Sequence, residues 1–190
     1  MRTLRLVTVA SVGLLALAAC GSQQGAAMFV GDERVSEATV DGYVEQVAEF
    51  REEQGEDLTM FDYSSDREQA AVFTLYTELG RQLELEAPGS PADADELDAL
   101  IAEASSYYET LLAQAEPRAL TEAEVEAVIT SAQSNTELAN LTQEQAEQLA
   151  GFSDDMNEYV EEYDIAVNPR YGHVDLSPIP GVFEVEIPQR

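Results

Sequence analysis

Apolar residues recur at helical spacing along most of this chain of 190 residues, and this periodicity constrains the fold more than any other feature. A stripe at positions i, i+3, i+4 and i+7 gives a helix one apolar face, which must pack against other elements to leave water. The sequence therefore predicts a mainly α fold with four to five helices. The predicted helices cover 37–51, 66–87, 93–115, the residues that follow the capping-box pattern at 121–124, and 137–164 with an interruption near Gly151.

Short extended segments are predicted at the two ends of the helical region. An apolar run at 27–30 precedes a turn, with Ser36 as the N-cap of the first helix, and a second run at 165–167 is stopped by an Asn-Pro pair. We expect the two runs to pair as a small antiparallel β element; the alternative is that each is an irregular arm. Residues 176–190 are predicted to form a hairpin or a loosely held tail.

Residues 1–20 have the organisation of an export signal. Two arginines precede an apolar run at 6–19, which is shorter than the about 20 residues of a membrane-spanning helix. The run leads into Leu-Ala-Ala-Cys at 17–20, which resembles the lipobox of bacterial lipoproteins. The resemblance implies that Cys20 receives a diacylglycerol and that a flexible tether at 21–27 holds the protein at the outer face of the cytoplasmic membrane. The alternative is an ordinary secretory cleavage before the cysteine.

The charge of the chain is strongly negative. The chain has nine basic residues, all of them Arg, and 38 acidic residues. Removal of the signal takes away two arginines, so the mature chain has seven basic residues and a net charge of −31. Such a surface repels nucleic acid and anionic lipid headgroups, so nucleic-acid binding is excluded. The charge indicates either solubility and adaptation to salt or the attraction of cations and basic partners. With Cys20 lipidated, no cysteine remains for a disulfide within the domain.

Two segments are similar to one known family when they are taken together. The segment at 29–38, FVGDERVSEA, and the segment at 163–172, YDIAVNPRYG, resemble the opening and closing segments of SurA-like chaperones and related parvulin-type foldase lipoproteins. The resemblance implies a helical chaperone module over 28–175, completed by a strand from the far end of the chain. It also implies a structural clasp in the closing segment, formed by Asn168, Pro169, Arg170, Tyr171 and Gly172.

Members of that family often carry a peptidyl-prolyl isomerase domain between these segments, but the interval 117–151 is too short for one. His173, Asp175 and Ser177 lie at alternate positions, which does not by itself build a catalytic triad. The acidic segment 93–98 lacks the Gly and the twelfth-position Glu of a calcium loop. We therefore expect no enzymatic activity, no cofactor and no metal site.

Aromatic and methionine side chains around the first two predicted helices are candidates for binding apolar peptide segments, as adaptable surfaces do in promiscuous binders. The alternative is that they complete the core. Together with the resemblance, they predict a membrane-anchored lipoprotein that holds unfolded or exported polypeptides without isomerising them. The alternatives are a non-catalytic envelope lipoprotein with one dedicated protein partner, and weak binding of divalent cations. The candidate residues are Tyr43, Phe50, Met60, Phe61, Tyr63 and Tyr76.

Overall fold

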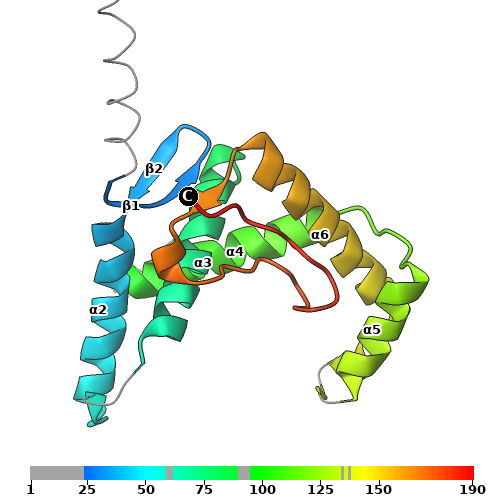
Figure 1. The fold of residues 1–190 in the computed structure, drawn as a ribbon, viewed down its shortest axis with the longest axis horizontal. Helices are drawn as coiled ribbons and strands as arrows, with labels where there is room; N and C mark the ends of the chain where they lie inside the picture. The colour runs from blue at the N-terminus through cyan, green and yellow to red at the C-terminus, as the bar shows by residue number, and fades with distance from the viewer. Residues whose placement is uncertain (1–23, 59–61, 90–94, 134, 137) are drawn as a thin grey trace, which may run out of the picture.

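The computed structural model describes residues 24–190, apart from 59–61, 90–94, 134 and 137, so the predicted signal and Cys20 lie outside the described residues. The predicted mainly α fold with a small antiparallel β element is confirmed (Figure 1). The elements are β1 (Ala26–Val30), β2 (Glu33–Ser36), α2 (Glu37–Glu53), α3 (Ser64–Gln82), α4 (Glu96–Gln114), α5 (Glu122–Ala132), α6 (Gln143–Glu162) and β3 (Ala166–Val167), with 3₁₀ turns at Leu138–Asn140 and Pro169–Tyr171.

Side-chain caps fix where the helices begin, because the first amide groups of a helix have no partner within it. Ser36 caps α2, as the sequence predicts, and Asp95 caps α4. Thr121 and Thr142 begin α5 and α6 with complete capping boxes, the first of which the sequence also predicts. The predicted starts of α2 and α5 agree with the structure because capping patterns are local in the sequence, whereas α6 begins at Gln143, six residues after the predicted 137.

The strand β1 is the centre of a three-stranded sheet with the order β2-β1-β3. It pairs antiparallel with β2 and antiparallel with β3, where Met28 lies opposite Val167. The predicted pairing of the two ends of the helical region is therefore confirmed. The end of the predicted tether is wrong, because Ala26 and Ala27 are buried in β1 and already belong to the fold.

The helix α3 lies at the centre of the helical layer and packs against α2, α4 and β1. Gly80 on α3 lets the ring of Tyr107 on α4 pack directly on the helix backbone, since a Cβ at this position would overlap that ring. Tyr107 is only 1% exposed. The helix ends at Gln82, earlier than the predicted 87, and Glu84 then adopts a left-handed φ of 52°.

Two predictions about the last third of the chain are wrong. The helix α6 continues through Gly151 without a break, because this glycine serves a close approach: a Cβ here would overlap the carbonyl oxygen of Glu116, in the segment after α4. The residues after 175 are not a loosely held tail, and among the described residues they form no hairpin. Their apolar side chains are buried against the helices, namely Leu176, Ile179, Phe183, Val185 and Ile187.

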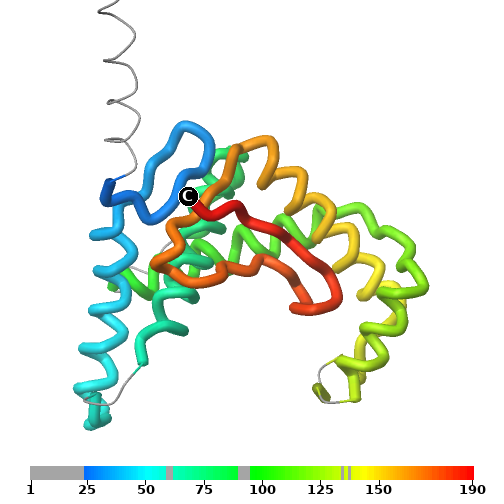
Figure 2. Tube along the Cα trace, viewed as in Figure 1, coloured from blue at the N-terminus to red at the C-terminus, as the bar shows by residue number. Residues whose placement is uncertain are grey.

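Figures 1 and 2 show that α2 and α5 project to the same side at opposite ends of the molecule. The C-terminal segment runs between them across the middle of the fold. None of the helices that the structure describes is both long enough and apolar enough to cross a membrane.

Candidate peptide-binding site

An apolar cleft lies between α5, the segment before it and the start of α6. Its volume is about 420 Å³, within the range of pockets that bind small ligands or side chains. The apolar residues are contributed by both helices and by the connections on either side of α5. The lining residues are Ala119, Leu120, Val125, Val128, Ile129, Leu141, Thr142, Gln143, Ala146 and Glu147.

The helix α5 is the least covered helix of the described fold. It has no buried residue, and Val125 and Ile129 are 41% and 58% exposed. The sequence predicts an apolar stripe on this helix, and a stripe ordinarily faces a core. Here only part of the stripe is covered, by a small cluster around Ile179 and Phe183 that half-buries Val128. The remainder of the apolar face stays available at the cleft.

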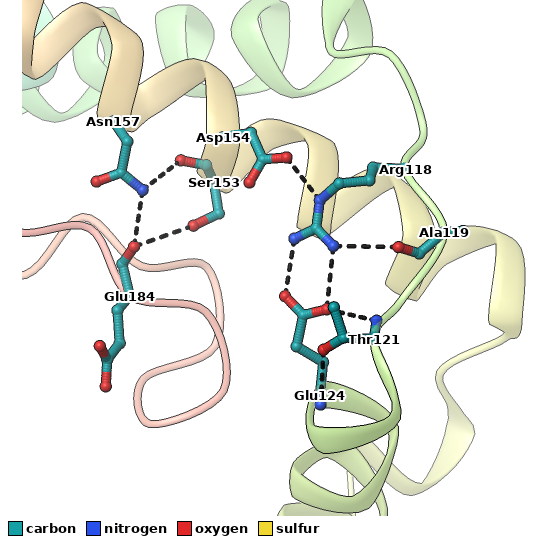
Figure 3. Close-up of polar contacts among 8 residues, drawn as sticks. All are labelled: Arg118, Ala119, Thr121, Glu124, Ser153, Asp154, Asn157 and Glu184. Carbon is teal, nitrogen blue, oxygen red and sulfur yellow. Dashed lines mark hydrogen bonds and ion pairs between the residues drawn. The ribbon is translucent and has the colours of Figure 1, made fainter.

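The base of α5 is held by Arg118, which lies just before the helix (Figure 3). Its Nη1 and Nη2 donate to Glu124 Oε2 and Oε1 at 3.0 and 2.8 Å, and Nη1 also donates to the Ala119 carbonyl at 3.1 Å. Its Nε lies 2.6 Å from Asp154 Oδ2 on α6. Glu124 also accepts from the amide of Thr121 at 2.7 Å, which completes the capping box. The polar contacts therefore fix the entry to α5 and involve none of its apolar side chains.

Further along α6, its side chains are bonded to the C-terminal segment, as Figure 3 also shows. Asn157 Nδ2 donates to the Glu184 carbonyl at 2.8 Å and to the Ser153 carbonyl at 3.0 Å. The hydroxyl of Ser153 donates to the same Glu184 carbonyl at 3.5 Å. The helix α6, whose start contributes to the cleft, is thus bonded, further along its length, to residues after 175.

Acid is expected to loosen the base of α5, because Glu124 must be ionised to accept the hydrogen bonds of Arg118. Those hydrogen bonds are the main reason that the pKa of Glu124 is lowered to about 2, whereas an unperturbed Glu has a pKa of about 4.3. A carboxyl whose pKa is lower in the folded state stabilises the fold above its unfolded pKa. This stabilisation is lost as the pH falls from about 4.3 towards about 2.

The check compares the wild type with Glu124→Gln by chemical denaturation at several pH values. At neutral pH the wild type should be more stable by roughly 1.5–3 kcal/mol, the range for hydrogen bonds to charged groups. The advantage should shrink below about pH 4.3. Glu126→Gln, which removes an exposed carboxylate of the same helix, is the control and should show no such change. An advantage that is independent of pH would contradict the prediction.

The six residues predicted to bind peptides are not brought together by the structure. Phe50 is 61% exposed and lines a separate groove between α2 and α4. Tyr76 is buried, and its hydroxyl donates to the Leu176 carbonyl at 3.3 Å, so it belongs to the core. Tyr43 and Tyr63 are half-buried against the core. Met60 and Phe61 lie outside the described residues.

The cleft residues Val125 and Ile129 are the functional candidates that sequence reasoning misses. Their stripe is visible in the sequence, but a stripe shows which face of a helix is apolar and not what covers it. One signal is the length of the helix: α5 has 11 residues, the shortest of the described α-helices, and short helices offer little area for packing.

The closing segment forms a clasp on the start of α2. Asn168 Nδ2 donates to the Ala26 carbonyl at 3.1 Å and to Glu37 Oε1 at 3.0 Å. Arg170 pairs with Glu37 and Asp41, each at 2.9 Å. The 3₁₀ turn contains Pro169, and Gly172 ends it with a φ of 80°. Tyr171, 1% exposed, donates its hydroxyl to the Glu37 carbonyl at 3.3 Å and to Asp41 Oδ1 at 3.2 Å. These contacts give the five residues a structural role.

The residues considered for catalysis have structural contacts too. Asp175 Oδ1 accepts from the amide of Ser177 at 2.8 Å, and Ser177 Oγ accepts from the amide of Val185 at 3.1 Å. His173 is exposed beside them. Asp95, from the acidic segment, caps α4. Within the described residues, no group of three or more His, Cys, Asp or Glu side chains is placed to hold a metal ion.

Comparisons of the chain with protein-family models, with curated proteins and with solved structures find no match.

Proposed function

We propose that this chain is a lipid-anchored extracytoplasmic protein that binds apolar segments of exported polypeptides and holds them without catalysing a reaction on them. The observation that carries the proposal is the apolar cleft beside α5. Val125 and Ile129, two of the three strongly exposed large apolar residues in the described part of the chain, both line this cleft. Two exposed apolar side chains are thus adjacent at one cleft, as expected of a binding site.

The expected affinity suits transient holding. Complete burial of a Val or Ile side chain contributes about 1.5–3 kcal/mol. Val125 and Ile129 are already about half covered, so the two together offer roughly 2 kcal/mol of further burial. Ordering an unfolded segment costs part of the gain. A dissociation constant of 1 mM already requires about 4 kcal/mol, so burial of these two side chains alone supports only weak, reversible capture and no permanent complex.

Lipidation of Cys20 would keep this cleft close to the membrane. The lipobox-like tetrapeptide and the single cysteine of the chain support it. Because β1 begins at Ala26, only five residues separate Cys20 from the fold, and five extended residues span at most about 18 Å. A tether of this length would keep the fold close to the membrane.

The test is the suppression of aggregation of an unfolded client protein by residues 21–190, which contain every described residue, together with binding of a fluorescent apolar peptide. Ile129→Asp should abolish both effects, because it places a charge in the cleft. Ala123→Asp, an exposed position of α5 outside the cleft, is the control of equal charge and should retain them. A wild-type protein that neither suppresses aggregation nor binds the peptide would refute the proposal. In cells, crosslinking to a single dominant protein would instead favour one dedicated partner.

A further inference from the structure

A second groove lies at the other end of the molecule, between α2 and the start of α4. Its volume is about 500 Å³. The apolar part consists of Val47 and Phe50 from α2 and of Leu97 and Ile101 from α4. Phe50 is 61% exposed, the largest exposed fraction among the large apolar residues in the described chain. The groove is therefore an apolar surface built by two helices, and it does not share residues with the α5 cleft.

The edges of this groove are acidic on both sides. Glu49 and Glu53 from α2, Asp98 from α4 and Asp95, the N-cap of α4, line it, and all four are exposed. None of its described lining residues is basic. Four carboxylates around an apolar floor favour an apolar group with positive charges beside it over one with negative charges beside it.

The two walls are held in register before any ligand arrives. Gln46 Oε1 accepts a hydrogen bond from the amide of Leu97 at 3.1 Å, which joins α2 to the first turn of α4. Arg51, next to Phe50 in the sequence, is bonded elsewhere: its Nη1 and Nη2 each donate to Asp66 at 3.0 Å. Its charge is therefore already engaged by a carboxylate of α3.

From this combination we propose that the groove between α2 and α4 binds a segment of another polypeptide in which one large apolar side chain is flanked by Arg or Lys. The apolar side chain covers Phe50, and the flanking cations meet the carboxylates of the two edges. A second copy of this chain is disfavoured as the occupant, because two mature chains each carry a net charge of −31, the nine arginines less two against 38 acidic residues. Anionic lipid is disfavoured for the same reason.

The affinity of such a segment depends on both its apolar side chain and its flanking cations. Exposed ion pairs are individually weak and are screened by salt, so several together are expected to change the dissociation constant about tenfold at low salt. Most of that gain should disappear at high salt. This proposal does not depend on the function of the α5 cleft, since the two sites have separate lining residues.

The experiment measures binding of three labelled peptides of equal length to residues 21–190 by fluorescence anisotropy. The first has a Phe flanked by arginines, the second has the same Phe flanked by glutamates, and the third has Ser in place of Phe between the arginines. The first should bind about tenfold more tightly than the others, and added salt should remove its advantage over the second. Equal binding of the first and second peptides at low salt, or equal binding of the first and third, would overturn the proposal.

Variants assign the binding to this groove. Phe50→Ser should weaken binding of the first peptide about tenfold. The double substitution Glu49→Gln and Glu53→Gln should have an effect of the same size. The pair Glu122→Gln and Glu126→Gln removes the same charge from α5 and should leave the binding unchanged, as should Ile129→Asp. Equal effects of the two charge-removing pairs would show that only the overall charge attracts the peptide and would overturn the assignment. The assignment would also be overturned if the protein self-associated and Phe50→Ser abolished that self-association. Because Ile129→Asp tests the α5 cleft, either proposal can fail without the other.

Discussion

Replacing Gly151 by Ala is expected to lower the free energy of unfolding by about 3 kcal/mol or to prevent folding. In an exposed helix the same change stabilises by about 1 kcal/mol, because Ala is the better helix former. At Gly151 the close contact with Glu116 makes the substitution destabilising instead. A Cβ on Gly151 would overlap the Glu116 carbonyl oxygen and would lie 2.9 Å from the Glu116 carbonyl carbon. Both atoms belong to backbone, so no side-chain rotation relieves the clash, and α6 would have to separate from the segment that leads to α5.

Urea denaturation of the wild type and the variant measures this effect. The matched control is Gly42→Ala on α2, since a Cβ at Gly42 meets nothing within 4 Å. The control is expected to be stabilised by up to about 1 kcal/mol. A Gly151→Ala protein at least as stable as the wild type would show that α6 does not approach the Glu116 backbone this closely.

Gly151 also shows why part of the fold could not be predicted from the sequence. The helical stripes and the caps at Ser36 and Thr121 follow from local patterns, and the structure confirms them, together with the expected pairing of the two terminal extended segments. A glycine inside a helical pattern has two interpretations, a break or a close approach, and only the neighbouring element distinguishes them. The end of α3 is a similar case. The Pro-Gly signal at 88–89 predicts a later end, but Glu84 terminates the helix in a left-handed conformation.

The sequence did not predict where the grooves of the candidate sites lie. Aromatic residues near α2 suggest peptide binding, and Phe50 does line a groove. The acidic residues on the far wall come from the start of α4, and no spacing in the sequence relates them to Phe50. In the same way the alternating residues Phe183, Val185 and Ile187 indicate an extended segment with one apolar face. They do not indicate that this face packs on helices without forming a strand ladder.

The C-terminal segment gives the second large effect: Phe183→Ala is expected to lower the free energy of unfolding by about 3–5 kcal/mol, the range for Phe to Ala in a core. Phe183 is 2% exposed and packs with Ile179 and Ala150 in the small cluster below the α5 cleft. Removal of its ring leaves a cavity whose walls include α6, and the hydrogen bonds of Glu184 limit how far the segment can collapse into it.

Phe50→Ala removes the same ring from an exposed position and is the matched control. Because 61% of the Phe50 surface is in water, Phe50→Ala should lower the free energy of unfolding by less than about 1 kcal/mol. If residues 176–190 were a loose tail, the two variants would unfold at the same urea concentration. A clear separation, with only Phe183→Ala destabilised, shows that the last fifteen residues are part of the domain. The same variant should also weaken binding of apolar peptides to the α5 cleft, because Leu120 and Val128 of that cleft rest on the cluster that Phe183 completes.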